Sequence, residues 1–327
     1  MPAPPNPRRI LGLALCLAAG PGSILAGQSL PIHHSLNPAA EARSGLYFQP
    51  YVPPHPGWRF QAAVDYASMV EYGLRLSLAD TSYMLDTEAL RLNLSASHDL
   101  GGRGFLLLEG WAGGTYNGFL DGFLDWYHGL FGIYYPEREA RRHNDYGYRY
   151  RRPDGQLLRF RRRDAYLGDV RVGVGLRHSP KVQTVLSLTL PTNTAGDGYA
   201  RGKPSINLLN TVRAPVTPRL IYEGSLNFGV SPGDGALRDV QERVFLLATS
   251  GGRWRTIGSL WSFANLYLHS PYYSRADARQ LDRWDLTIDF GWMVRSRGGR
   301  EFRFGMSEDL WPSGPAIDAN FRVGYSW

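Results

Sequence analysis

A regular alternation of apolar and polar residues recurs along this chain. It is clearest in the last twelve residues, AIDANFRVGYSW, where every second side chain from Ile317 to Trp327 is apolar. The segments RWDLTIDFGWMV, PRLIYEGSLNFGV and VRVGVGLR have the same period. Because successive side chains of a β-strand point to opposite faces, a period of two predicts strands with one apolar and one polar face.

The pattern predicts twelve strands, joined by links whose lengths alternate. The strands span residues 58–68, 83–96, 103–113, 165–177, 181–191, 205–214, 218–230, 240–249, 253–268, 283–296, 300–309 and 316–327. Three of them, GFLLLEGWA, ERVFLLAT and GSLWSFANLYL, are apolar on both faces, so their registers stay open. Short links such as HSP, PVT, SGG and RSRGG alternate with longer ones, including a connection over about 114–164.

This sorting of the links predicts an all-β fold, a transmembrane antiparallel up-and-down β-barrel. Bacterial outer-membrane barrels have an even number of strands, tight turns in the periplasm and longer loops outside. A large soluble barrel of the lipocalin type is the alternative, but both of its ends meet the same solvent. After Ala26 no stretch has the ~20 apolar residues that a membrane-spanning helix needs.

The last strand also predicts its own register. One of its faces carries no charge, whereas the other would place Arg322 in hydrocarbon, at a cost of ~2–4 kcal/mol near the midplane. We therefore expect Arg322 to face the bore and the last strand to close the ring against the first. The final aromatic residues resemble the signal by which the barrel-assembly machinery recognises outer-membrane proteins, with Tyr325 and Trp327 in that role.

The first residues predict export. Arg8 and Arg9 precede an apolar run, and Ile24-Leu25-Ala26 precedes Gly27, a pattern typical of a cleaved signal peptide. An uncleaved, buried N-terminal helix is the alternative. We expect a signal peptide over 1–26, a periplasmic segment over 27–56 and a barrel over 57–327 in the outer membrane of a Gram-negative bacterium. Cys16 is the one cysteine, so the exported chain has no disulfide.

The connection over 114–164 contains the sequence NGFLDGFLDWYHGLFG. At about 100° per residue its apolar side chains fall on one arc roughly 160° wide, which predicts a short amphipathic helix. The apolar face either folds into the barrel mouth as a plug or lies on the outer leaflet, and we favour the mouth. The predicted plug or lid residues are Phe119, Phe123, Trp126, Tyr127 and Leu130.

Arginines dominate the second half of the same connection. The net charge of the whole chain is +7, and without Arg8 and Arg9 it is +5, the same excess that residues 137–164 carry alone. Arginine binds phosphate through paired hydrogen bonds, so contacts to lipopolysaccharide or to anionic solutes are expected, with a solvated loop as the alternative. The candidate residues are Arg138, Arg141, Arg142, Arg149, Arg151, Arg152, Arg161, Arg162 and Arg163.

Several segments together resemble a known family. NGFLDGFLDWYHGLFG, the tyrosine-rich HNDYGYRY, the strand-to-loop VLSLTLPT and the aromatic C-terminus are similar to the proteobacterial outer-membrane proteins grouped as domain of unknown function 3187. The resemblance covers most of the exported chain. It implies a barrel in the outer membrane and brings no catalytic residues with it.

Three functions are consistent with such a barrel. The first is a passive channel or uptake protein for small solutes, whose identity the sequence does not reveal. Charged residues of both signs would line the water-filled path, although a paired network filling a narrow bore is the alternative. The expected lumen-lining residues are Arg171, Arg177, Arg213, Arg219, Glu223, Asp285, Asp289, Arg295, Arg303, Asp318 and Arg322.

The second function is a structural barrel that interacts with membrane lipid and lipopolysaccharide. The third is a lipid-modifying hydrolase, for which Asp125 and His128, one helical turn apart, are the candidate catalytic pair. His33 and His34 have no third ligand at a suitable spacing, so we expect no metal site and no cofactor. Export disfavours nucleic acid as a partner.

Overall fold

The computed structural model describes residues 35–44, 46, 51–72, 82–130, 132, 143–278, 280–296, 299–310 and 319–327. The expected signal peptide and the pair His33-His34 lie outside the described residues. So do Arg138, Arg141, Arg142 and Asp318 from the candidate sites.

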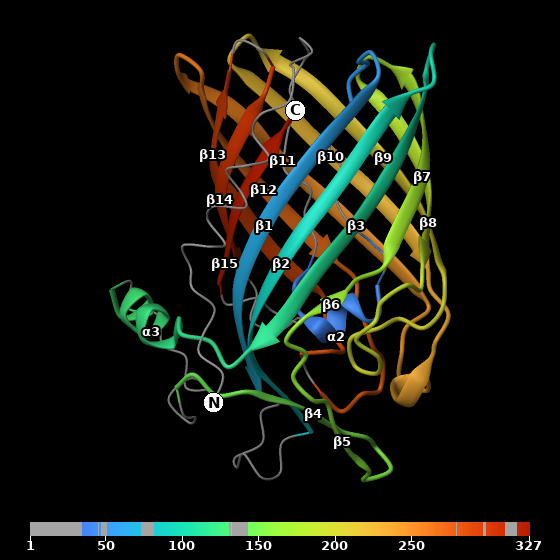
Figure 1. The fold of residues 1–327 in the computed structure, drawn as a ribbon, viewed down its shortest axis with the longest axis vertical. Helices are drawn as coiled ribbons and strands as arrows, with labels where there is room; N and C mark the ends of the chain where they lie inside the picture. The colour runs from blue at the N-terminus through green and yellow to red at the C-terminus, as the bar shows by residue number, and fades with distance from the viewer. Residues whose placement is uncertain are drawn as a thin grey trace.

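Twelve antiparallel strands form a closed ring, as the alternation predicts (Figure 1). The ring closes where the last strand pairs with the first, and Phe321 lies opposite Tyr66. Trp327 ends the chain within this pairing, since its backbone and that of Phe60 exchange two hydrogen bonds of 3.0 and 3.1 Å. The twelve strands are β1(Trp58–Tyr72), β2(Tyr83–Asp99), β3(Gly104–Tyr116), β7(Val170–Ser179), β8(Val182–Leu190), β9(Ser205–Thr217), β10(Leu220–Val230), β11(Val244–Ile257), β12(Leu260–His269), β13(Asp285–Arg295), β14(Glu301–Asp309) and β15(Ala319–Ser326).

The two ends of the barrel differ. The hairpins after β2, β7, β9, β11 and β13 turn at one end, here called the turn end, which is uppermost in Figure 1. The longer connections gather at the opposite loop end. The smaller elements belong to these connections or to the segment before β1: α2(Pro38–Glu41), α3(Asp121–Leu130), β4(Gly147–Arg151), β5(Leu157–Arg159), β6(Tyr166–Leu167) and η1(Gly235–Leu237).

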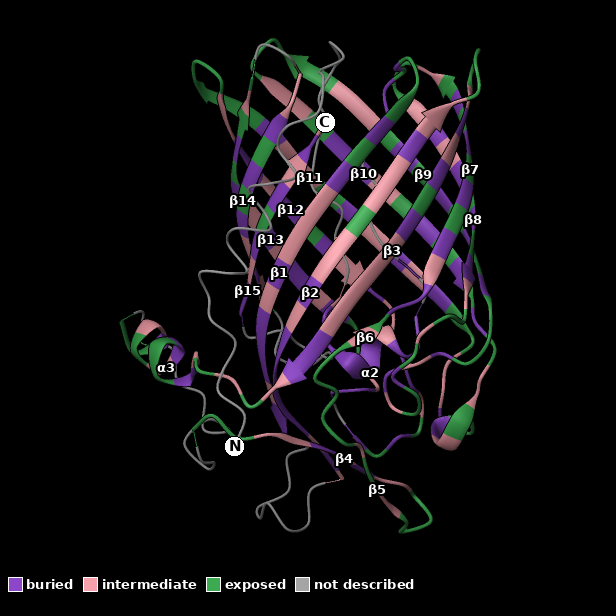
Figure 2. Ribbon diagram, in the orientation of Figure 1, coloured by how far each residue is buried: buried purple, intermediate pink, exposed green. Residues whose placement is uncertain are grey.

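Burial alternates along the strands with the predicted period (Figure 2). On β7 the side chains of Val172, Val174 and Leu176 are exposed on the outer wall, whereas Arg171 and Arg177 are buried inside. Arg322 is buried at 3% exposure and Val323 next to it is 44% exposed, so the predicted register of the last strand is confirmed. The outer wall is therefore apolar, whereas the inner wall combines buried polar and charged side chains with apolar clusters around Phe105 and Phe263.

One predicted turn is wrong. The link Ser250-Gly251-Gly252 runs inside β11, and the chain turns instead at Gly258, whose φ of +52° suits a glycine. Position 251 requires a glycine because the strands approach closely here: a Cβ would lie 2.3 Å from the backbone oxygen of Ala264. A glycine inside a strand marks such an approach as often as it marks a turn.

We expect a short epitope inserted after Gly258 to leave the barrel folded, because exposed turns tolerate insertion. The same epitope inserted after Ser250 would break the pairing of β11 with both neighbours. The measurement is the heat-dependent shift of the refolded protein in SDS gel electrophoresis. Equal folding of the two insertions would contradict the assigned turn.

Candidate functional site

The bore of the barrel contains the chain segment that precedes β1. We call the described residues 35–44, 46 and 51–56 the plug segment. Its backbone reaches the turn end, where the N–H of Val52 donates to Gln183 and the N–H of His55 donates to Asp99, at 2.9 and 2.6 Å. Arg177 in turn donates to the carbonyl of Val52 at 2.8 Å. The expected periplasmic position of residues 27–56 therefore differs from what the structure shows for this segment.

The other end of the plug segment is held at the loop end. Asn37 caps α2 by accepting from the N–H of Ala39 at 2.9 Å. Arg43 is fully buried and donates to the carbonyls of Glu242, Ser231 and Pro232 in the connection after β10. Burial lowers the pKa of Arg43 to about 10, which leaves it charged at neutral pH. A backbone with no strand partner thus satisfies its polar groups through the wall and the loops.

A cluster of buried tyrosines covers α2 at the loop end. Tyr273 donates to the carbonyl of Ala39 at 2.9 Å, and Tyr150 and Tyr148 donate to the loop carbonyls of Ala276 and Gly198. Burial raises the pKa of Tyr273, so its hydroxyl keeps the proton that it donates. We call this cluster the tyrosine roof; it consists of Tyr83, Tyr148, Tyr150, Tyr199, Tyr272 and Tyr273.

Ion pairs connect the inward charges across neighbouring strands. Arg322 of β15 lies 2.6 Å from Asp65 of β1 and 3.2 Å from Asp289 of β13, and all three side chains are at most 3% exposed. Asn320 and Ser307 complete the group by donating to Asp65 and Asp289, respectively, at 3.1 Å each. A buried charge is tolerated only when it is paired and hydrogen-bonded, and this group meets both conditions.

Further pairs follow the wall in both directions. They are Arg303 with Glu301 at 2.8 Å, Arg171 with Glu109 at 2.9 Å, Arg177 with Asp99 at 2.5 Å, Arg201 with Asp169 at 2.9 Å and Arg213 with Glu223 at 3.7 Å. Together with the group around Arg322, these residues form what we call the inner-wall network. Its charges of opposite sign neutralise one another inside the bore.

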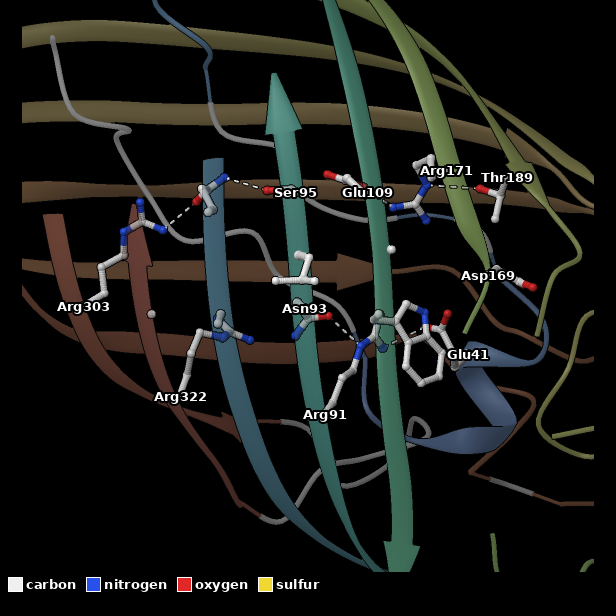
Figure 3. A pocket seen from close by; sticks show the side chains of 16 residues that line it. Glu41, Arg91, Asn93, Ser95, Glu109, Asp169, Arg171, Thr189, Arg303 and Arg322 are labelled. Carbon is white, nitrogen blue, oxygen red and sulfur yellow. Dashed lines mark hydrogen bonds and ion pairs between the residues drawn. The ribbon is translucent and has the colours of Figure 1, made fainter. Parts of the chain in front are cut away.

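A small cavity lies between Glu41 of the plug segment and a wall that includes β15, β1, β2, β3 and β7 (Figure 3). Its volume is about 40 Å³, room for a few water molecules. Arg91 spans one side: it contacts Glu41 of α2 at 3.3 Å, Asn93 at 2.6 Å, and its guanidinium lies 4.0 Å over the ring of Trp111. Arg91 Nη2 and Glu109 Oε1 are buried here without a hydrogen-bond partner among the described residues.

The predicted lumen residues are found mostly where the alternation puts them. Arg171, Arg177, Arg213, Glu223, Asp285, Asp289, Arg303 and Arg322 point into the bore, and Arg295 lies half-buried at its turn end. Arg219 does not, because it sits exposed in the turn between β9 and β10. The sequence reasoning missed Asp65, Arg91, Glu109, Arg253 and Glu301, although period two would have placed Asp65 opposite the apolar row of its strand.

The amphipathic helix forms as predicted, but not in the mouth. α3 lies beside the outer wall (Figure 1). Phe119 packs on Tyr66 and Phe123 on Phe321, with ring centroids 5.2 and 6.2 Å apart, and both wall residues point outward. The prediction of a plug made of Phe119, Phe123, Trp126, Tyr127 and Leu130 is therefore wrong. The plug segment already occupies the bore, and α3 uses its apolar side chains outside it.

The described arginines of the long connection contact the protein's own loops in several places. Arg152 donates to the carbonyl of Ala236 and pairs with Asp239 at 3.1 Å, and Arg162 pairs with Asp164 at 2.8 Å. Arg149 and Arg151 lie on β4 and are half-buried, whereas Arg161 and Arg163 are exposed. Binding of lipopolysaccharide by these residues stays a prediction.

The candidate catalytic pair, Asp125 and His128, lies one turn apart on the side of α3 that faces away from the exposed Trp126, and its catalytic role stays a prediction. Asp125 pairs with His143 at 2.9 Å, and His128 is buried on the opposite side of α3 from the exposed Phe119 and Trp126. Across the described parts of the chain, no three His, Cys, Asp or Glu side chains are grouped to hold a metal ion. No described helix is long and apolar enough to cross a membrane.

Comparison with known proteins agrees with this architecture. The model of the family "Protein of unknown function (DUF3187)" matches residues 34–327, and the chain belongs to that family. No curated protein matches the chain.

Among solved structures, the COG4313 outer membrane channel from Pseudomonas putida F1 is similar, with a TM-score of 0.54 and 12% identity over 84% of this chain and 99% of that one. A FadL homologue from Pseudomonas aeruginosa has a TM-score of 0.43 and 9% identity over 92% and 99% of the two chains. The protein is thus a transmembrane β-barrel with the fold of an outer-membrane channel.

We expect Arg322→Met to destabilise the barrel by about 3–5 kcal/mol, because it leaves two buried carboxylates, Asp65 and Asp289, without their cation. A triple variant, with Arg322→Met, Asp65→Asn and Asp289→Asn, removes the three charges together and should recover most of the lost stability. The measurement is urea unfolding in lipid vesicles. If Arg322→Met alone is as stable as the parent protein, the ion pairs of Arg322 contribute nothing to the stability of the barrel.

Proposed function

We propose that this protein is an outer-membrane channel for small polar solutes, closed at rest by its own plug segment. The observation that carries the proposal is the set of paired, buried charges that line the inner wall of a closed barrel. Lipid-facing barrels with a polar interior are typical of solute pathways. The similarity to an outer membrane channel is one of fold, and it is consistent with this role.

The plug segment has the properties of a removable gate. It is joined covalently to the wall only through β1, and at the turn end it is held by hydrogen bonds, such as those from Val52 and His55, rather than by apolar packing alone. Exchange of such bonds for bonds to water costs little net free energy, about 0.5–1.5 kcal/mol each. Movement of the segment would therefore open the bore without unfolding the barrel.

The wall left behind would carry both charge signs. Four arginines and three carboxylates line the cavity, and Arg91 and Glu109 each have a buried polar atom with no partner among the described residues. A bore of this kind favours hydrated, polar solutes over apolar ones. Because the inner-wall pairs neutralise each other, we expect only modest selectivity between small anions and cations.

Conductance in planar bilayers tests the proposal. The refolded chain without residues 1–26 should conduct rarely, whereas a variant lacking residues 35–52 should conduct steadily. The matched control lacks residues 153–156, the exposed tip between β4 and β5, and should behave like the parent protein. If the barrel without residues 35–52 folds and still seals the bilayer, the bore is closed by its own wall and the channel proposal fails.

A further inference from the structure

Helix α3 presents an apolar face that no described part of the protein covers. Phe119, Phe123, Trp126 and Leu130 are 68, 43, 63 and 65% exposed. At about 100° per residue Phe123, Trp126 and Leu130 fall within roughly 60° of one another on the helix surface, and Phe119 lies just before the helix begins. The opposite side of α3 is polar and occupied, since Asp125 pairs with His143 and Asp121 accepts from the N–H of Asn144 at 2.5 Å.

The outer wall shows where hydrocarbon ends. On β2 the outward row reads Leu94, Leu92, Leu90 and then Glu88, and on β14 it reads Phe302, Phe304, Met306 and then Glu308. A carboxylate on the lipid-facing wall is tolerated near the interface and not at the midplane. The two glutamates thus mark one level around the barrel, close to the loop end.

Helix α3 is fastened at this same level. Glu88 accepts the N–H groups of Phe119 and Leu120 at 2.9 and 2.6 Å, and also the hydroxyl of Tyr66. A carboxylate suits the first turn of a helix, where N–H groups lack partners and the dipole is positive. Gly118 has a φ of +87° and no room for a Cβ beside Glu88, so the chain enters the helix in one orientation.

The far half of α3 is fastened by a second carboxylate. Tyr127 interacts with Glu308, and burial, with a smaller contribution from this carboxylate, raises the pKa of Tyr127. The Tyr127 hydroxyl therefore stays protonated and donates a hydrogen bond to Glu308. The helix spans the seam where the ring closes, from β2 across β1 and β15 to β14, with Phe123 resting on Phe321.

We propose that α3 is a membrane-interface helix whose exposed face, Phe119, Phe123, Trp126 and Leu130, is buried among the lipids of the leaflet at the loop end. The exposed face is continuous with the lipid-facing wall through the ring contacts to Tyr66 and Phe321. An amphipathic helix lies with its apolar side about 5–10 Å deep at the boundary between headgroups and acyl chains. Tryptophan and tyrosine side chains, here Trp126 and Tyr127, prefer this depth.

Single cysteines test the proposal, because the chain after residue 26 has none of its own. Leu130→Cys places a fluorescent label on the exposed face of α3. Val323→Cys, on the outer wall, is the lipid-exposed control, and Gln156→Cys, at the tip between β4 and β5, is the water-exposed control. Each variant is refolded into phosphatidylcholine vesicles, and folding is checked by the heat-dependent gel shift.

Quenching by a nitroxide carried on phosphatidylcholine acyl chains is compared with quenching by iodide in the water. We expect the label at residue 130 to be quenched by the lipid nitroxide to the extent seen at residue 323, and iodide to quench only the label at residue 156. Trp126→Cys repeats the test one turn earlier and should give the same result. Iodide quenching at residues 130 and 126 like that at residue 156 would overturn the proposal, whether the face then meets water or a soluble partner.

Discussion

Every charge inside this barrel has to find its partner inside the barrel. The outer wall lies in lipid, so the inward side chains cannot reach bulk water through it, and an ion left alone in such a place is strongly unfavourable. The group of Arg322, Asp65 and Asp289 shows the result: three buried charges from three strands, each within 3.2 Å of an opposite one. This pairing ties β15 to β1 and β13, and so it acts across the seam at which the ring closes.

The same constraint explains why the plug segment fits. Arg177 bonds to the backbone of the segment as well as to Asp99, and Arg91 bonds to Glu41 of α2 as well as to Asn93. Each of these arginines thus bonds both to a side chain of the wall and to the plug segment, a chain that has no strand partner. A filled bore and a charged wall are compatible here because the filling meets the wall through polar bonds as well as through apolar packing, such as that of Leu46 and Val52.

Much of the fold was predictable because its cause is local. Period two follows from the geometry of a single strand, and the charge on Arg322 alone selects the face of the last one. Two wrong predictions, the turn at residues 250–252 and the plug made by α3, share a different cause: both depend on contacts with other strands. The glycines of β11 read as a turn because the close approach of Ala264 and Asn265 is set by a neighbouring strand. The position of α3 depends on Glu88 and Phe321 of the outer wall, and neither contact is visible from the helix sequence.

The network itself was the least predictable part. Arg91 and Glu109 lie on strands whose sequences are apolar on both faces or change face along their length, so their partners follow only from the registers between strands. The family assignment agrees with the barrel but assigns no residue to a role. Electrostatic partnerships of this kind come from the closed ring as a whole, and no single segment encodes them.

The most direct test of this account is a reactivity scan of β13 in lipid vesicles, with cysteine placed in turn from residue 286 to residue 294. Positions 286, 288, 290, 292 and 294 should contact a lipid-borne quencher, and positions 287 and 293 should be protected from lipid and from a small water-soluble thiol reagent alike. Asp289 and Gly291 are left unchanged, because Asp289 pairs with Arg322 and a side chain at 291 would meet the backbone of Phe304. Free reaction of the second set with the aqueous reagent would show an open, hydrated bore. Loss of the alternation altogether would contradict the barrel.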